Sequence, residues 1–338
     1  MKLRLTIFVF CVAASSAGIT SGSDTIPVTA DNFVRAESDT VLSGFYPQGF
    51  GKFQHLRELA SLDFQIVQRG NRDTLYSMGM FDLDAGPVTI TLPDAGNRYL
   101  ILLVINEDHY AINFFYGAGT HTLNREEIGT RYVLAAVRML VDPNDAADVA
   151  AVHVLQDKIM FKQPGGPGKW EIPNWEKKSH KTIRDALTVV GATLPDWNHA
   201  AGKKDEVDPI RHLLVTATGW GANPEKAAVY LNRFPKQNDG TTIHKLTVKD
   251  VPVDGFWSVS VYDAQGYYEK NELNAYSLNN VTATKDANGS ITVQFGGCDR
   301  KVANCLPIMP GWNYTVRLYR PRAEILNGKW TFPEAQPQ

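Results

Sequence analysis

The sequence predicts an α+β protein that is mainly β, in which a helical middle region joins two β-sandwich-like lobes. Residues 31–141 and 236–333 contain short apolar runs, several of them alternating with polar residues, as strands require. Residues 142–235 instead place apolar side chains at helical spacing. We therefore expect an N-terminal β-rich domain, a helical middle region and a C-terminal β-rich domain.

Residues 1–17 predict a cleavable signal peptide. Lys2 and Arg4 precede the apolar run Leu5–Ala14, and small residues follow at Ser15 and Ala17. The run is shorter than the roughly 20 residues that span a bilayer, although a retained membrane anchor is the alternative. We expect cleavage after Ala17, export of the mature chain and no membrane span in it.

The charge balance argues against nucleic acid as a partner. The chain has 34 basic and 36 acidic residues and a formal net charge of −2. The two signs are mixed along the chain, so no basic surface for nucleic acid or an anionic membrane is predicted.

In the N-terminal region, the order of apolar and polar residues mostly predicts strands. A polar leading segment at 24–40 is followed by a predicted helix over 50–60, because Phe53, Leu56 and Leu59 share one helical face. Strands are then expected from Thr74 onward and over the apolar segments 88–92, 99–105, 110–116 and 131–141.

The middle region predicts four helices. The first starts at Asp145 and extends to Ile159, and the next two occupy 175–190 and 205–220. The glycine- and proline-rich stretch 163–169 separates the first two as a loop. Pro224 suits the first turn of a short fourth helix ending at Leu231.

Strand patterns return after residue 241. Residues 257–262 alternate apolar and polar side chains, which predicts a strand with one buried face. A turn at 286–289 introduces a strand, and the alternation at 314–318 predicts another.

Cys298 and Cys305 are the cysteines that remain after the leader is removed. In an oxidising compartment, two cysteines this close in sequence are expected to form a structural disulfide. A metal site would need more ligands than Asp299 adds, and the spacing differs from the CxxC of redox pairs.

Several long strings resemble known family signatures. Asn71–Ser77 followed by Phe81–Leu83 resembles the signature of domain of unknown function 1254. Residues 255–268, the turn at 286–290 and the segment 305–333 resemble its usual companion, domain of unknown function 1214.

This resemblance implies two β-sandwich-like lobes with helices between them, in bacterial exported proteins. Together with the leader, it predicts a periplasmic or secreted location. It transfers no catalytic residue, because no reaction is attached to the family. The short region between the lobes implies a narrow cleft.

The densest group of polar residues lies in the N-terminal region. Arg72 and Asp73 enter the strand that carries Tyr76, and Asp108 and His109 follow the end of the strand at 99–105. If these segments adjoin, Arg72, Asp73, Asp108 and His109 are candidate catalytic residues, since an imidazole beside a carboxylate can transfer protons near neutral pH. Tyr76 is a candidate ligand contact.

Other roles for the same residues remain open. Arg72 and Asp73 can instead pair with each other, as buried charges require. His55, Asp108 and His109 together offer ligands for a divalent metal. His55 is also a candidate substrate contact.

The third predicted helix carries a second set of candidate substrate-binding residues, Arg211, His212 and Trp220. A position between the lobes suits a ligand pocket, but one histidine on an amphipathic helix is often structural. The tryptophans of this region can stack on sugar rings or pack the lobes together: Trp170, Trp175, Trp197 and Trp220.

Two functions remain open. The chain has no GxSxG elbow, phosphate-binding loop, HExxH or GxGxxG in a strand–helix context. We therefore expect a protein that binds a small envelope or extracellular molecule, a lipid or a carbohydrate, between two β lobes. The alternative is a hydrolase- or lyase-type enzyme that uses the N-terminal Arg/Asp/His cluster. Neither function calls for a cofactor.

Overall fold

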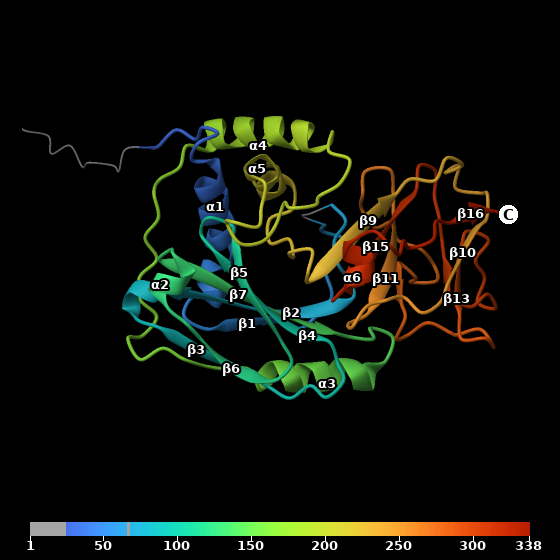
Figure 1. Cartoon of the computed structure of the whole chain (residues 1–338), viewed down its shortest axis with the longest axis horizontal. Helices are drawn as coiled ribbons and strands as arrows, with labels where there is room; N and C mark the ends of the chain where they lie inside the picture. The colour runs from blue at the N-terminus through green and yellow to red at the C-terminus, as the bar shows by residue number, and fades with distance from the viewer. Residues whose placement is uncertain (1–24, 66–67) are drawn as a thin grey trace, which may run out of the picture.

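A five-stranded antiparallel sheet forms the centre of the N-terminal lobe (Figure 1). The computed structural model describes residues 25–65 and 68–338, so the predicted signal peptide lies outside the described residues. The strand order is β1-β2-β7-β4-β5, with β1 at Phe53–Leu56, β2 at Thr74–Asp82, β7 at Tyr132–Leu140, β4 at Leu100–Asn106 and β5 at Ala111–Tyr116.

One face of this sheet is covered by a second, three-stranded sheet and by α3 (Ala146–Asp157) (Figure 1). The small sheet has the order β6-β3-β8, formed by Gly119–Leu123, Val88–Leu92 and Met160–Lys162. A short 3-10 turn, Leu83–Ala85, precedes β3. All seven residues of β4 are buried because this strand is covered on both faces, as its continuous apolar run predicted.

Helices cover the opposite face of the five-stranded sheet. There α1 (Phe33–Gly49) contacts β2, α4 (Lys177–Gly191) and α5 (Pro209–Thr218) (Figure 1). Glu37 of α1 accepts hydrogen bonds from His180 Nε2 at 2.7 Å and Arg184 Nε at 2.9 Å. These hydrogen bonds to Glu37 and the apolar contacts around Phe33 hold α4 on α1. The short α2 (Arg125–Ile128) precedes β7.

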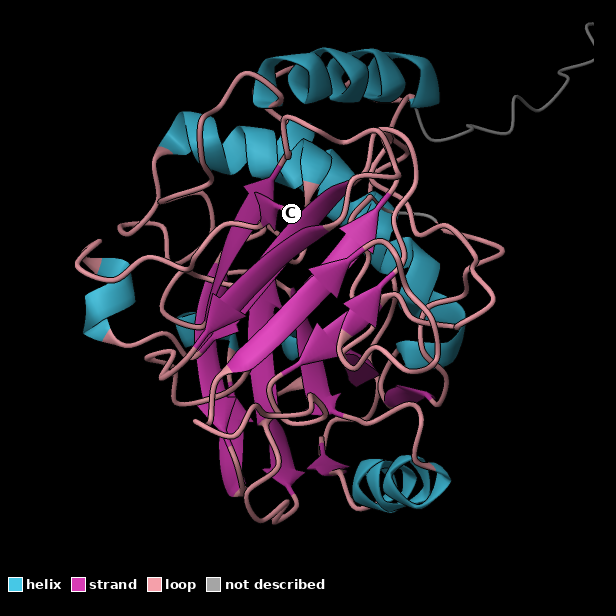
Figure 2. Cartoon of the chain, turned by 90° about the vertical axis from the view of Figure 1, so that its right-hand side faces the viewer, coloured by secondary structure: helices cyan, strands magenta, loops and turns pink. Residues whose placement is uncertain are grey.

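Two four-stranded sheets face each other in the C-terminal lobe, which lies toward the viewer in Figure 2. The inner sheet has the order β12-β11-β15-β9, formed by Ser277–Asn279, Trp257–Tyr262, Asn313–Tyr319 and Ala228–Arg233. The outer sheet has the order β14-β13-β10-β16, formed by Cys305–Leu306, Ile291–Phe295, His244–Val248 and Gln336–Pro337. Apolar side chains from both sheets form one core, and α6 (Ala323–Leu326) closes the lobe.

The predicted α+β class is confirmed, and most predicted strands and the first three middle helices are present. Asp145 caps α3 by accepting a hydrogen bond from the Ala147 N–H at 2.9 Å, and Asp208 caps α5 in the same way through the Ile210 N–H. Among the described residues, no helix combines the length and the apolar character needed to cross a bilayer.

The helix predicted over 50–60 is wrong, because this segment contains β1. Gly51 has a φ of 64°, and a Cβ at this position would lie 2.4 Å from the Cβ of Pro167. The chain therefore turns sharply here, after which Phe53 pairs with Gly79 at the edge of the sheet. Cross-strand pairing overrides the helical spacing of the apolar residues.

The fourth middle helix is also wrong, because residues 224–227 form a turn and β9 begins at Ala228. Conversely, the polar leading segment at 24–40 contains most of the first half of α1, whose apolar stripe is weak. Its buried face carries Glu37, Ser38 and Asp39, so hydrophobic periodicity gives little signal.

The strand at 257–262 was expected to have one exposed face, but all six of its residues are buried. Its polar residues contact the N-terminal lobe: Ser258 Oγ donates a hydrogen bond to Asp73 Oδ2 at 2.6 Å, and Tyr262 OH donates one to the Gly70 carbonyl at 2.9 Å. The polar face of β11 is therefore the face on which the two lobes meet.

Candidate functional site

A groove of about 700 Å³ lies between the two lobes. Its N-terminal wall includes Arg57, Glu58 and Arg72, and its C-terminal wall is formed by the loops at 273–278 and 299–306. A position at the interface of two lobes is common for ligand sites.

The exposed surface of the groove is polar. Six of its lining residues are exposed, and all except Pro143 are charged or carry an amide: Glu58, Asn144, Asn274, Asp299 and Arg300. Of the aliphatic lining residues, Leu75, Val141 and Leu306 are buried, and the others apart from Pro143 are half-buried. A ligand in the groove would therefore meet hydrogen-bonding groups first.

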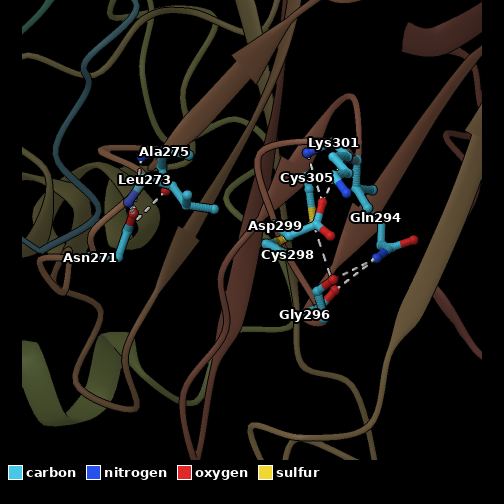
Figure 3. Close-up of a disulfide and its surroundings, with 11 residues drawn as sticks. Asn271, Leu273, Ala275, Gln294, Gly296, Cys298, Asp299, Lys301 and Cys305 are labelled. Atoms are coloured by element: carbon cyan, nitrogen blue, oxygen red, sulfur yellow. Dashed lines mark hydrogen bonds between the residues drawn. A yellow bond between two sulfur atoms is a disulfide. The ribbon is translucent and has the colours of Figure 1, made fainter.

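One loop of the C-terminal wall is closed by the predicted disulfide, which is confirmed between Cys298 and Cys305 (Figure 3). Inside this loop, Asp299 Oδ1 accepts hydrogen bonds from the N–H groups of Lys301 at 2.7 Å and Val302 at 3.0 Å. These bonds fix the backbone that presents Arg300 to the groove.

The neighbouring loop is organised by Asn271, whose side chain points back into its own turn (Figure 3). Its Nδ2 donates to the Ala275 carbonyl at 2.9 Å, while its Oδ1 accepts from the N–H groups of Ala275 at 3.1 Å and Leu273 at 3.2 Å. Both loops of this wall are thus shaped by local bonds, independently of any ligand.

Removing the disulfide is expected to destabilise the protein. Replacing Cys298 and Cys305 together with serine should lower the free energy of unfolding by about 2.5 kcal/mol, because a short closed loop restrains the unfolded chain. Urea unfolding of the exported chain measures this, and wild-type protein in reductant should match the double variant. A loss below about 0.5 kcal/mol would contradict the prediction.

Arg72 is the predicted catalytic residue that lines the groove. Its Nη1 donates a hydrogen bond to the Ala60 carbonyl, and its Cζ lies 5.6 Å from the ring centroid of Tyr276. Burial lowers the pKa of Arg72, but a guanidinium stays charged in proteins. Arg72 therefore places a positive charge on the N-terminal wall.

The two other arginines of the groove differ in their freedom. Arg57 forms an ion pair with Asp157 and donates to the His153 carbonyl at 2.8 Å, which ties it to α3. Arg300 is exposed and makes no ion pair within the described part of the chain. Of the three arginines, Arg300 is therefore the one that a ligand can bind without breaking an ion pair or a side-chain hydrogen bond to the described residues.

Asp73 lies outside the groove, buried where the lobes meet, with 1% of its surface exposed. Its Oδ2 accepts from Ser258 Oγ at 2.6 Å and from Tyr319 OH at 3.5 Å. Burial raises the pKa of Asp73, and the nearby charge of Arg317 opposes that rise. The sequence analysis offered pairing of Asp73 with Arg72 as one alternative, but the two side chains form no hydrogen bond or ion pair with each other.

Arg317 of β15 fastens the loop before β2 to the C-terminal lobe. Its guanidinium donates to Ser260 Oγ at 2.8 Å, to Tyr262 OH at 2.6 Å, and to the carbonyls of Arg69 at 2.8 Å and Gly70 at 3.0 Å. The polar loop that the sequence singled out is therefore the main hydrogen-bonded link between the lobes.

Asp108 and His109 belong to a different network, beneath the helices. Asp108 Oδ1 accepts from Arg35 Nη2 at 2.6 Å. His109 Nδ1 bonds Thr216 Oγ1 at 2.8 Å, and its Nε2 accepts from the Gly221 N–H at 2.8 Å. Burial lowers the pKa of His109 to about 3, so the imidazole is neutral and both its nitrogens are occupied.

The four predicted catalytic residues thus lie in three settings and form no hydrogen bond or ion pair with one another across them. His55, proposed as a metal ligand with Asp108 and His109, lies on β1, where its Nδ1 bonds Ser77 Oγ at 2.8 Å. Within residues 25–65 and 68–338, no three His, Cys, Asp or Glu side chains are grouped so that they could hold a metal ion.

The candidate substrate contacts on α5 and beside it also bond within the protein. Arg211 pairs with Asp196 at 2.7 Å, His212 is buried and bonds the Asp108 carbonyl at 3.0 Å, and Trp220 Nε1 donates to Ser38 Oγ at 3.0 Å. None of the three lines the groove.

Sequence reasoning missed the C-terminal wall of the groove. Tyr276, Arg300 and Asn304 line it, yet the sequence marked residues 299–304 only as the turn of a disulfide. The available signal was the density of polar residues inside this closed loop, since loops that are fixed by a scaffold often carry binding residues.

Comparisons with known proteins agree with the two-lobe architecture. A family model described as "Protein of unknown function (DUF1254)" matches residues 50–127, and one described as "Protein of unknown function (DUF1214)" matches residues 229–323. None of the curated proteins matches the chain.

Two solved structures share the fold. The VPA0106 protein from Vibrio parahaemolyticus is 18% identical, with a TM-score of 0.70 over 91% of this chain and 98% of that one. An uncharacterized protein from Burkholderia cenocepacia is 12% identical, with a TM-score of 0.50 over 91% of this chain and 86% of that one.

Proposed function

Since this chain belongs to the proteins that combine domain of unknown function 1254 with domain of unknown function 1214, we propose that it is an exported protein that binds a small polar molecule, a carbohydrate rather than a lipid, in the groove between its lobes. The observation that carries the proposal is the groove of about 700 Å³ whose walls come from both lobes. The apolar leader and the disulfide support export, because disulfides persist in oxidising compartments.

The chemistry of the walls favours a hydroxylated ligand. Carbohydrates are recognised by dense hydrogen bonding, and amide, carboxylate and guanidinium groups all face this groove. An acyl chain would instead need mostly apolar exposed walls, whereas five of the six exposed lining residues here are charged or carry an amide. Arg300 and Arg72 on opposite walls also favour a sugar that carries an acidic group.

The enzyme alternative stays a prediction. A hydrolase or lyase that used Arg72, Asp73, Asp108 and His109 together would require these side chains to face one reacting group. Asp73 instead contacts the C-terminal lobe, and both ring nitrogens of His109 are occupied by protein partners. No contact of these residues favours this function.

Replacing Arg300 with alanine is expected to weaken ligand binding roughly tenfold or more, since it removes a charged hydrogen-bond donor. Calorimetric titration with a panel of neutral disaccharides and uronic acids measures the effect on the exported chain. Lys301→Ala is the matched control, because Lys301 lies in the same loop but does not line the groove.

The same panel includes vesicles of phosphatidylglycerol. Binding of a saccharide that weakens in Arg300→Ala but not in Lys301→Ala supports the proposal. Binding of vesicles alone, binding of no saccharide, or equal affinity in both variants would overturn it.

A further inference from the structure

A row of four side chains, three of them polar, crosses the five-stranded sheet beside the C-terminal lobe, away from the groove. Tyr76 on β2 pairs in register with Arg138 on β7, Arg138 with Ile101 on β4, and Ile101 with Tyr116 on β5. Directly paired residues project from the same face, so these four side chains lie on the face that α1 covers further along the sheet. None of them lines the groove.

Aromatic side chains from both lobes surround Arg138. Its Cζ lies 5.3 Å from the ring centroid of Tyr76. Tyr99, which precedes β4, has its ring centroid 5.4 Å from that of Tyr319 and 6.0 Å from that of Tyr116. The charge of Arg138 lowers the pKa of Tyr99 against the larger effect of burial, which raises it, so the two groups are neighbours.

Arg138 has no counter-ion in the described part of the chain. Its one hydrogen bond to the protein runs from Nη2 to the Gly221 carbonyl at 2.9 Å. Its Nε is buried and has no partner. Arg138 as a whole is half-buried, but a buried N–H donor without a partner costs free energy, so a folded protein rarely retains one without a ligand or water to satisfy it.

Arg317 differs from Arg138 in the number of its hydrogen-bond partners. Arg317 also lies where the lobes meet, but its guanidinium makes four hydrogen bonds, and the carboxyl group of Asp73 lies near enough to interact with its charge. The two arginines share the lobe junction, and only Arg317 is satisfied from within the protein.

Further unpaired polar atoms lie beside Arg138. The hydroxyls of Tyr99 and Tyr116 are buried and have no hydrogen-bond partner, and neither does Asn223 Oδ1. Burial raises the pKa of Tyr116 to about 12, so its hydroxyl is protonated and can donate a hydrogen bond. Asn223 is held in place through its Nδ2, which donates to Tyr230 OH at 2.6 Å.

We propose that Arg138, together with the Tyr99 hydroxyl, binds the carboxylate of a small organic acid at a second site between the lobes. A planar carboxylate matches the fork of a guanidinium, and the free Nε of Arg138 offers one arm of that fork. One negative charge balances the charge of Arg138, and Arg320, whose Cζ lies 4.4 Å from the ring centroid of Tyr116, adds a second positive charge nearby. The rings of Tyr76, Tyr116 and Tyr319 supply apolar walls for the body of the acid.

Titration with benzoate and acetate tests this site, with chloride at equal ionic strength as the reference. Both carboxylates are expected to bind and to raise the melting temperature beyond chloride. Arg138→Gln should weaken benzoate binding by about thirtyfold or more, because a charge-assisted bidentate contact is lost. Arg125→Gln is the control, since Arg125 is an exposed arginine of the same lobe, paired with Asp84.

Tyr99→Phe separates a binding role from a structural one. Because the Tyr99 hydroxyl has no partner in the protein, its removal should leave the free energy of unfolding unchanged or raised, while benzoate binding falls about fivefold or more. Equal stabilisation by chloride, no carboxylate binding to wild-type protein, or unchanged affinity in Arg138→Gln and Tyr99→Phe would overturn the proposal, leaving water as the partner of Arg138.

Discussion

Replacing Arg317 with methionine is expected to lower the free energy of unfolding by about 3–5 kcal/mol. The variant loses four hydrogen bonds from a buried guanidinium, two of them to the carbonyls of Arg69 and Gly70. It also leaves the buried carboxyl group of Asp73 without its nearby positive charge. Since these groups join the two lobes, we expect their association to weaken as well. Urea unfolding followed by tryptophan fluorescence measures the loss.

Arg322→Met is the matched control for this experiment. Arg322 lies in the same lobe and pairs with Asp254 at 2.7 Å, but both side chains are about half exposed. Exposed ion pairs contribute at most about 1 kcal/mol, so this variant should unfold almost as wild type does. If Arg317→Met loses no more than Arg322→Met, the lobe junction does not depend on this arginine.

Replacing Asp39 with asparagine is expected to stabilise the protein at pH 8 and to have little effect at pH 4. Asp39 is fully buried in α1, and burial raises its pKa from 3.8 to about 7, against the hydrogen bond from Trp175 Nε1 at 2.7 Å. Glu107 and Asp108 raise this pKa further, and Arg35 lowers it.

The sign of the pH dependence follows from these pKa values. Between about pH 4 and pH 7, the unfolded chain releases the Asp39 proton while the folded protein keeps it, so stability falls as pH rises. Above pH 7 Asp39 is ionised in both states, so the loss of folding free energy no longer changes with pH. A rise in pKa from 3.8 to about 7 corresponds to a loss of about 4 kcal/mol at most. We therefore expect Asp39→Asn to gain about 2–4 kcal/mol at pH 8.

Urea unfolding of both proteins at several pH values measures this difference. Asp31→Asn, a change at an exposed position just before α1, should follow wild type at every pH. A constant difference between Asp39→Asn and wild type from pH 4 to pH 8 would show that Asp39 titrates alike in the folded and unfolded chains, against the prediction.

The sequence predicted elements well where one local pattern decides the structure. The continuous apolar run of β4 and the alternation of β3 and β15 are visible in a few consecutive residues, and Asp145 caps its helix through a neighbouring N–H group. The disulfide was predictable because Cys298 and Cys305 are close in sequence and share a turn.

Prediction failed where a distant partner decides the structure. The segment around Phe53 has helical spacing, yet pairing with β2 makes it a strand. The first helix was missed because its buried face is partly polar. The side chains that bond Glu37 there, His180 and Arg184, lie more than a hundred residues away in the chain.

The sequence by itself determined the α+β class and the disulfide, and it singled out Arg72, Asp73 and Tyr76 only as candidate site residues. Only the tertiary structure decided that Arg72 lines a groove, that Asp73 joins the lobes, and that Tyr76 stands in one row with Arg138. The physical reason is that hydrophobic periodicity records burial within an element, whereas the partner of a buried charge depends on strand register and on the contact between lobes.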